Sequence, residues 1–197
     1  AVGEVRRAVR IWQVEPGLHL LAPIAGPVSG KCRVVFDGSG ERVAAEAYDG
    51  TIRIWDTTRG ETLSVLRGHS RPVYCIAFSP NGKRLATGVG DNEVCIWDTT
   101  TEQGSIGYGG GKTAVHDLAV SPDGQRLAAG FADGTVRIWD GATGEAIHVI
   151  AHPGQDAWCV AFSPDGARLA EASEDGAVRM YDAATGRLEL QFTEHIR

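Results

Sequence analysis

The stretch VYCIAFSPNGKRLATGVGDNEVCIWD, residues 73–98, contains two turn signals, Pro80-Asn81-Gly82 and Asp91-Asn92. Proline, asparagine, aspartate and glycine tolerate the backbone angles of tight turns. The turns separate three short segments rich in β-branched and apolar residues, which favour strands: 73–79, 83–89 and 93–98. The stretch therefore predicts three antiparallel strands joined by short connections.

The same pattern recurs along the whole chain. The motifs VRIW, IRIW, VCIW, VRIW and VRMY end at Trp12, Trp55, Trp97, Trp139 and Tyr181, in steps of 43, 42, 42 and 42 residues. The turns FDGSG, FSPNG, VSPDG and FSPDG keep the same step at 36–40, 78–82, 120–124 and 162–166. Apolar segments at 61–67 and 145–151 supply fourth strands in their units. The repeat is therefore a four-stranded antiparallel meander of about 42 residues.

Such a unit is apolar on both faces and is stable only when it is stacked on copies of itself. No segment has the long 3.6-residue apolar period of a helix. The predicted fold class is all-β, one domain over 1–197 with four full repeats and a partial N-terminal one. The expected boundaries are 1–26 for the partial blade and 27–68, 69–110, 111–152 and 153–194 for the repeats.

These features resemble the WD40-repeat β-propeller family over essentially the entire chain. The resemblance is carried by Gly68-His69, the Ser-Pro-Asp-Gly turns, and the Trp-Asp pairs at 55–56, 97–98 and 139–140. The regular repeats are similar to those of large bacterial regulatory proteins. Since WD40 rings usually hold about seven blades, the resemblance implies a piece of a longer propeller. The alternative is a ring that is completed in trans through open edges.

In this family a hydrogen-bonded tetrad of His, Ser or Thr, Asp and Trp ties each blade together. The resemblance assigns this role to His69, Thr87, Asp91 and Trp97. The other units have Pro27, Gly111 and Pro153 at the His position and Ala45, Ala129 and Glu171 at the Thr position. We therefore expect those blades to depend on packing and on the structural turn aspartates Asp49, Asp133 and Asp175.

The composition excludes several classes of partner. With 19 Lys and Arg against 25 Asp and Glu, the net charge of −6 offers no attraction to nucleic acid or anionic lipid. The chain has no apolar stretch long enough to span a membrane and no signal segment, so we expect a cytoplasmic protein. The four cysteines lack CxxC spacing and are expected to be free, buried thiols rather than disulfides or metal ligands.

The stretch GYGGGKT, residues 107–113, resembles a phosphate-binding loop but lacks its spacing. The loop pattern needs a glycine six residues before the lysine, where this chain has Ile106. A phosphate loop also leads into a helix, whereas 114–121 matches an inner strand. We interpret the stretch as a connector between blades.

His69, Thr87 and Asp91 resemble a hydrolytic cluster, but the resemblance to the WD40 family implies that they are structural. Carboxylates such as Glu171 and Glu174 are expected to be surface charge. No cofactor, metal or catalytic residue is expected.

Partners of WD40 proteins usually dock at the mouth of the propeller, where the connectors and the turn aspartates emerge. One repeat position there holds Cys32, Tyr74, His116 and Trp158, and another holds Tyr48, Gly90, Ala132 and Glu174. These positions vary while the framework is nearly constant. The candidate partner-binding residues are Tyr48, Tyr74, His116, Asp156, Trp158 and Glu174. Tyr74 and Trp158 could equally cover the inner rim, and the acidic pair Asp156 and Glu174 could attract a basic peptide.

The resulting hypothesis is a non-catalytic scaffold or sensor of WD40 type, with a signalling role, that binds a protein or peptide across its mouth. The first alternative is a structural or assembly module completed by self-association or by further blades. The second is a propeller enzyme with a hydrolase or nucleotide site.

Overall fold

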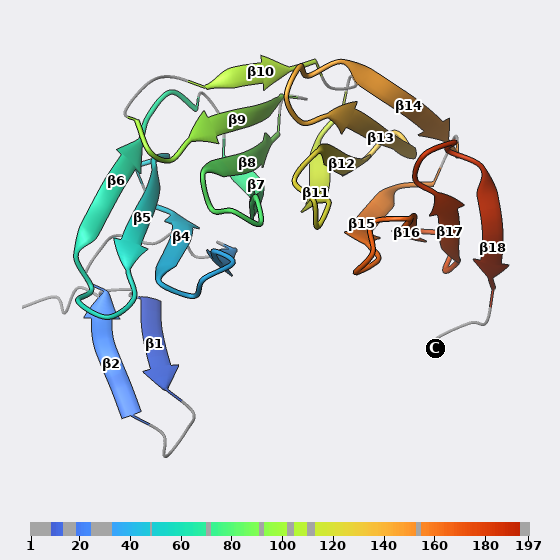
Figure 1. Cartoon of the computed structure of the whole chain (residues 1–197). Coiled ribbons are helices and arrows are strands. Elements are labelled where there is room, and N and C mark those ends of the chain that lie inside the picture. Colours follow the sequence, from blue (N-terminus) through green and yellow to red (C-terminus); the bar gives the residue numbers. More distant parts are fainter. Residues whose placement is uncertain are drawn as a thin grey trace, which may run out of the picture.

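The computed structural model describes residues 9–13, 19–24, 33–47, 49–69, 72–90, 93–101, 105–109, 113–152 and 155–193. Within these residues the secondary structure is entirely β, in five antiparallel sheets. A two-stranded sheet contains β1 (Val9–Gln13) and β2 (His19–Ile24). The sheets follow one another along an arc, with this sheet at one end and the last four-stranded sheet at the other (Figure 1). The predicted all-β fold class is thereby confirmed.

Four sheets have four strands each, which we call blades 1 to 4. Blade 1 contains β3 (Val34–Phe36), β4 (Arg42–Glu46), β5 (Ile52–Asp56) and β6 (Thr62–Leu66). Blade 2 contains β7 (Val73–Phe78), β8 (Arg84–Val89), β9 (Val94–Asp98) and β10 (Ile106–Tyr108). Blade 3 contains β11 (Val115–Val120), β12 (Arg126–Phe131), β13 (Thr135–Asp140) and β14 (Ala146–Ala151). Blade 4 contains β15 (Ala157–Phe162), β16 (Arg168–Ser173), β17 (Val178–Asp182) and β18 (Leu188–Phe192).

Within each blade the strands pair in chain order, as a meander requires. The first strands β7, β11 and β15 lie on the inside of the arc, and the fourth strands β10, β14 and β18 lie on its outside (Figure 1). The turns between first and second strands contain glycines with positive φ, such as Gly82 at 64° and Gly166 at 70°. Residues with a side chain are strained at these angles, so the Pro-Asn-Gly and Pro-Asp-Gly turns fix where each second strand begins.

The core lies between blades rather than within them. Successive side chains of a strand point to opposite faces of its sheet, so each blade has two apolar faces. We call the face that contacts the next blade along the chain the forward face, and the opposite one the rear face. Ala86 on the forward face of blade 2 shares a buried cluster with Leu127 and Trp139 on the rear face of blade 3. The same arrangement packs blade 1 on blade 2 and blade 3 on blade 4.

The interpretation of GYGGGKT as a connector is wrong in part. Ile106, Gly107 and Tyr108 form β10, which pairs with β9, and Tyr108 is buried in the cluster between blades 2 and 3. The Tyr108 hydroxyl donates a hydrogen bond to the Gly141 carbonyl at 2.9 Å. Residues 106–108 therefore form the fourth strand of blade 2, and residues 110–112 of the stretch, Lys112 included, lie outside the described residues.

Candidate interaction surface

Blade 2 is held together by hydrogen bonds between three of the four expected tetrad residues. The Trp97 indole Nε1 donates to the Thr87 hydroxyl at 2.9 Å, and the same hydroxyl lies 3.2 Å from His69 Nε2. The His69 ring also meets the Trp97 ring edge-on, with centroids 4.8 Å apart. These contacts connect β9 to β8 and to the connector before β7. Asp91 lies outside the described residues.

Blades 1 and 3 have no hydroxyl at the position of Thr87. In blade 1 the residue is Ala45, and the buried Trp55 Nε1 has no hydrogen-bond partner among the described residues. In blade 3 the residue is Ala129, and the Trp139 ring packs against the rings of Tyr108 and Phe131. In these two blades the tryptophan is held mainly by packing rather than by the hydrogen bonds of the tetrad.

Blade 4 departs from the expectation, because a different set of residues replaces the tetrad. The Tyr181 hydroxyl donates to Glu171 Oε2 at 2.6 Å and lies 2.5 Å from His152 Nε2. Glu171 is only 1% exposed, so its interpretation as surface charge is wrong. Burial, together with the bond to Glu171, raises the pKa of Tyr181 and keeps its hydroxyl protonated.

The sequence contained a signal for this network that repeat alignment missed. Alignment placed Pro153 at the His69 position, whereas the imidazole is supplied by His152, one residue earlier. Tyr at the Trp position and Glu at the Thr position occur in the same unit, and a phenol and a carboxylate form a hydrogen-bonded pair. The replacement of both residues in one unit therefore indicated that the two side chains bond to each other.

The turn aspartates act locally. Asp49 Oδ1 accepts hydrogen bonds from the Thr51 hydroxyl at 2.6 Å and the Thr51 backbone N–H at 3.1 Å, and Asp133 does the same with Thr135. Asp175 accepts from the Ala177 N–H and pairs with Arg179. The bond from Thr51 lowers the pKa of Asp49 to about 2, and the bond from Arg179 lowers the pKa of Asp175 to about 2. These residues close the turns between second and third strands.

Four of the predicted partner-binding residues come together at the boundary of blades 3 and 4. The rings of His116 and Trp158 stack with centroids 4.2 Å apart and planes inclined by 21°. His116 Nε2 lies 3.0 Å from Asp156 Oδ2, and the Glu174 N–H donates to the Asp156 carbonyl at 2.9 Å. We call His116, Asp156, Trp158 and Glu174 the mouth cluster. Trp158 is 49% exposed.

The remaining predicted residues lie apart from the mouth cluster. Tyr74, on blade 2, is exposed and lies over Gly90, where a Cβ atom would approach the Tyr74 ring to 3.0 Å. Because Gly90 has no Cβ atom, the Tyr74 ring can lie close to the backbone of residue 90. Tyr48 lies outside the described residues.

A buried carboxylate that sequence reasoning did not select lies beside the mouth cluster. Asp117 accepts a hydrogen bond from Arg33 Nη1 at 2.7 Å, and its other oxygen accepts from the Val160 N–H at 3.1 Å. Arg33 belongs to blade 1, Asp117 to blade 3 and Val160 to blade 4. Only the curvature of the arc brings the three together, so no local pattern could reveal the contact.

The cysteines agree with the expectation except at Cys159. Cys75 and Cys95 are buried, Cys75 and Cys159 are free thiols, and Cys32 lies outside the described residues. Cys159 is exposed, and its Sγ donates to Asp117 at 3.0 Å. Partial burial and the Asp117 carboxylate raise the pKa of the Cys159 thiol, which disfavours the nucleophilic thiolate.

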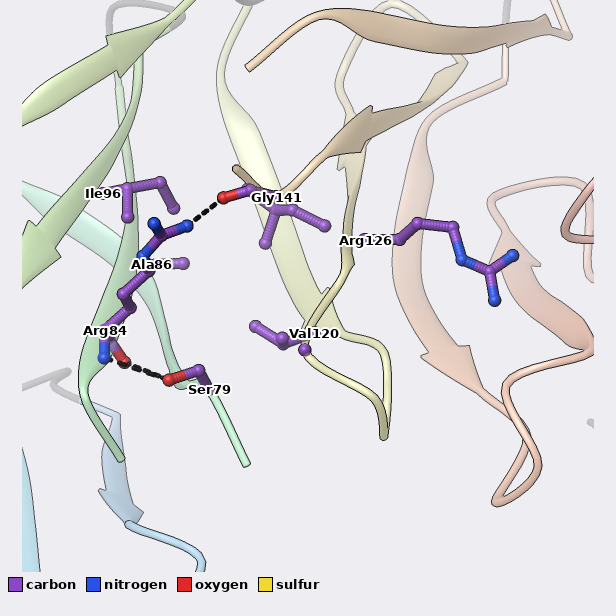
Figure 2. Close-up of a pocket in the computed structure, with 9 residues that line it drawn as sticks. Ser79, Arg84, Ala86, Ile96, Val120, Arg126 and Gly141 are labelled. Atoms are coloured by element: carbon purple, nitrogen blue, oxygen red, sulfur yellow. Dashed lines mark hydrogen bonds between the residues drawn. The ribbon is translucent and has the colours of Figure 1, made fainter. Parts of the chain in front are cut away.

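Figure 2 shows a groove between blades 2 and 3, with the apolar side chains of Ala86, Ile96 and Val120 along it. Arg84 spans this groove and donates a hydrogen bond to the Gly141 carbonyl. Ser79 fixes the start of β8 by accepting a hydrogen bond from the Arg84 N–H at 3.0 Å. The Arg84 side chain thus bridges blades 2 and 3 across the groove.

The described residues contain no group of three or more His, Cys, Asp or Glu side chains placed to hold a metal ion. No helix long and apolar enough to cross a bilayer occurs in the described part of the chain.

Known proteins resemble this chain through its repeats. The zebrafish (Danio rerio) protein "Dynein assembly factor with WD repeat domains 1" is 38% identical over 64 residues, which are 32% of this chain and 15% of that protein. The human protein of the same name is 44% identical over 45 residues, 23% of this chain and 11% of its own length. The matches thus span less than a sixth of these relatives.

Among solved structures, the computationally designed Ika8 protein superposes with a TM-score of 0.72 at 26% identity, over 82% of this chain and 48% of that one. The family model "WD domain, G-beta repeat" matches residues 24–56, 60–98, 104–140 and 144–182. The second match begins just before β6 and ends with β9, so the sequence repeat is offset by one strand from the blade. The chain belongs to the WD40 repeat family, whose repeats indicate a protein-interaction scaffold.

Proposed function

We propose that the chain is a non-catalytic interaction module that holds a protein or peptide at the mouth cluster. The observation that carries this proposal is the fixed and exposed indole of Trp158. Its ring stacks on His116, which in turn is held by Asp156. An aromatic side chain that is ordered before the partner arrives loses little conformational entropy on binding. Tryptophan and tyrosine are also the residues that dominate binding energy at protein interfaces.

The charge around Trp158 favours a basic partner. The Asp156 carboxylate contacts His116, on which the indole stacks, and the Glu174 carboxylate accepts a hydrogen bond from the Asp156 N–H at 3.4 Å. A lysine or arginine of a partner could pair with these carboxylates and lie over the indole face, where a cation is attracted by the ring. The net charge of −6 speaks against nucleic acid or an anionic membrane as the partner, and we propose a cytoplasmic location.

The polar groups that resemble catalytic ones have structural roles. Thr87 and His69 hold Trp97, and Glu171 and His152 hold Tyr181. A nucleophile needs a lowered pKa or an adjacent base, whereas the pKa of the Cys159 thiol is raised. This supports a binding role over a hydrolytic one.

The test is a selection of peptides from a random display library on the full chain, followed by affinity measurements on the selected peptides. We expect Lys- or Arg-containing peptides whose affinity falls at least about tenfold with Trp158→Ala, as for an interface hot spot. Leu63→Ala is the matched control, because Leu63 is 52% exposed on β6, the outer strand of blade 1. Peptides that bind the Trp158→Ala and wild-type chains equally well would contradict the proposal. Tyr74→Ala shows whether the surface extends to blade 2.

The proposed contact can be followed directly by fluorescence. Of the tryptophans whose side chains are described, Trp55, Trp97 and Trp139 are buried and Trp158 is exposed. A bound peptide should shield Trp158 from a soluble quencher such as acrylamide. The shielding should disappear in the Trp158→Ala chain.

A further inference from the structure

Two of the three boundaries between the four blades contain a phenyl ring beneath a guanidinium group. The arginine begins the second strand of one blade, and the phenylalanine ends the first strand of the next. The Arg42 guanidinium carbon of blade 1 lies 5.6 Å from the centroid of the Phe78 ring of blade 2. Arg126 of blade 3 lies 5.6 Å from the Phe162 ring of blade 4. An aromatic ring therefore fills the space under the arginine at these boundaries.

The boundary between blades 2 and 3 differs because its phenylalanine is replaced. The first strand of blade 3 ends with Val120 at the repeat position of Phe78 and Phe162. Val120 lines the groove between these two blades (Figure 2). A valine side chain fills much less volume than a phenyl ring, so we attribute the groove to this replacement.

The exposure of Ile96 agrees with this cause. Its counterparts Ile54 and Ile138 are 1% and 0% exposed, and each belongs to a buried cluster against which the phenylalanine of the next blade packs. Ile96, which has Val120 as its neighbour in that place, is only partly buried. Ile106 pairs with Ile96 across β9 and β10 and is 62% exposed, which extends the apolar surface. Apolar side chains are therefore open to solvent at this boundary.

Arg84, the arginine of this boundary, binds a different acceptor from its counterparts. At the other two boundaries the arginine donates to the carbonyl of the turn glycine after the phenylalanine, as Arg126 does to Gly166 at 2.8 Å. The equivalent acceptor for Arg84 is Gly124, which lines the groove. Arg84 instead donates to the Gly141 carbonyl on the far side of the groove (Figure 2). Because Arg84 is exposed, it can move onto a ring that enters the groove without disturbing the core.

The charges at the groove favour an aromatic side chain with basic neighbours. The electron-rich face of an aromatic ring complements the guanidinium of Arg84. Two carboxylates lie within its electrostatic reach. The Thr100 hydroxyl chiefly lowers the pKa of Asp98, and the Thr143 N–H chiefly lowers the pKa of Asp140. The charge of Arg84 lowers both further, so both groups are ionised at neutral pH and complement lysine or arginine beside the ring.

We infer that the groove between blades 2 and 3 binds a partner peptide through a phenylalanine flanked by lysine or arginine, with its ring against Ile96 and Val120 and under the Arg84 guanidinium. The chain itself indicates this occupant, because its own Phe78 and Phe162 fill the same position at the neighbouring boundaries. The inference does not depend on the mouth cluster, so failure of peptide binding there leaves it unaffected.

The test is a selection from a display library of short peptides with a fixed central phenylalanine. The library is first depleted on the full chain with Val120→Phe, in which a built-in ring fills the groove, and is then selected on the unchanged chain. We expect enriched peptides to carry Lys or Arg beside the phenylalanine and to bind the Val120→Phe chain at least about tenfold more weakly. If no peptide is enriched, the groove is not a docking site. Acidic residues beside the phenylalanine would overturn the inferred charge of the partner.

Three further variants assign the contacts of the selected peptides. Arg84→Ala removes the cation above the ring, so we expect the affinity to fall about fivefold. Arg187→Ala is the matched control, because it removes an exposed arginine of blade 4 and leaves the groove intact. Trp158→Ala should also leave the affinity unchanged, which separates the groove from the mouth cluster. Equal affinity in the Arg84→Ala chain would overturn the role of Arg84, and a loss with Trp158→Ala would place the peptides at the mouth instead.

Methyl NMR spectra of the unchanged chain locate the bound ring without relying on any variant. The ring current of a phenylalanine in the groove should shift the methyl signals of Ala86, Ile96 and Val120, which line it. The methyl signals of Ile138, which is buried at the next boundary, should not move. Urea unfolding shows whether the Val120→Phe chain is folded, and if it is not, the methyl shifts decide. Selected peptides that leave the Ile96 methyl signals unchanged would overturn the inference.

Discussion

Blades 2 and 4 solve the same structural problem with different chemistry. In blade 2 a neutral hydroxyl on β8 receives the indole N–H of the third strand and meets a histidine from the preceding connector. In blade 4 the carboxylate of Glu171 on β16 receives the Tyr181 hydroxyl, and His152 supplies the imidazole. Each network joins the second strand, the third strand and the connector before the first. The repeat preserves which positions contact one another, although the residues at those positions differ.

The two networks differ in how fully their polar groups are satisfied. Thr87 is fully buried and connects to both Trp97 and His69. Glu171 is equally buried, yet its Oε1 atom has no hydrogen-bond partner among the described residues. A buried carboxylate is costly unless its oxygens are bonded. Hydrogen bonds to a charged group are nevertheless stronger than those between neutral groups, so we expect disturbance of the blade 4 network to cost more than disturbance of the blade 2 network.

The largest expected effect is that of Glu171→Ala. It removes the acceptor of a buried hydroxyl and leaves a cavity beside Tyr181, so we expect the free energy of unfolding to fall by about 3 kcal/mol. Glu171→Gln, which keeps the shape and one acceptor oxygen, should cost about 1 kcal/mol. Urea unfolding followed by circular dichroism measures both. Equal losses for the two variants would show that the carboxylate charge, rather than the packing, is what blade 4 requires.

The corresponding change in blade 2 is Thr87→Val, which keeps the shape of the side chain and removes its hydroxyl. The Trp97 N–H is then buried without its acceptor, and we expect a loss of about 1–2 kcal/mol. The same unfolding measurement applies. A loss larger than that of Glu171→Ala would reverse the proposed order of the two networks.

Blade 1 allows the network to be built rather than broken. Ala45→Thr places a hydroxyl where Thr87 stands in blade 2, within reach of Trp55 Nε1, which has no hydrogen-bond partner in the described part of the chain. Relative to Ala45→Val, which has the same size without the hydroxyl, we expect a gain in stability of about 1 kcal/mol. Comparing the two variants cancels the cost of the added volume. If threonine is no more stable than valine, Trp55 does not need an acceptor.

The smallest expected effect comes from the turn that lies next to the blade 4 network. The bond from Arg179 lowers the pKa of Asp175 from 3.8 to about 2, so the folded state binds fewer protons than the unfolded chain between these values. The stability that Asp175 contributes is present above pH 4 and is lost as the pH falls toward 2. Because the pair is partly exposed, we expect about 1 kcal/mol or less. Asp175→Asn should flatten the acid slope of the unfolding midpoint, and an unchanged slope would assign it to other carboxylates.

The sequence was a good guide wherever the relevant contacts are local. The strand around Trp97, the turn at Gly82 and the roles of Asp49 and Asp133 follow from residues within one hairpin, where propensity and turn chemistry act. The mouth cluster was also accessible, since equivalent positions of successive units lie side by side in a stacked repeat. The repeat pattern gave a wrong assignment in two places. In blade 4 the imidazole comes from His152, one position before the expected one, and in blade 2 the fourth strand, β10, is shorter than those of the other blades.

The repeat step of 42 residues determined by itself that the chain forms four-stranded blades with one face turned to the next, because each strand, turn and alternating face depends on neighbouring residues. Only the tertiary structure decided which polar groups are paired in blade 4 and across the arc. Glu171 became a buried acceptor because blade 4 packs on blade 3, and Arg33 reaches Asp117 across an intervening blade. Such contacts depend on the curvature of the whole arc, which is a sum over all blades and is encoded in no single repeat.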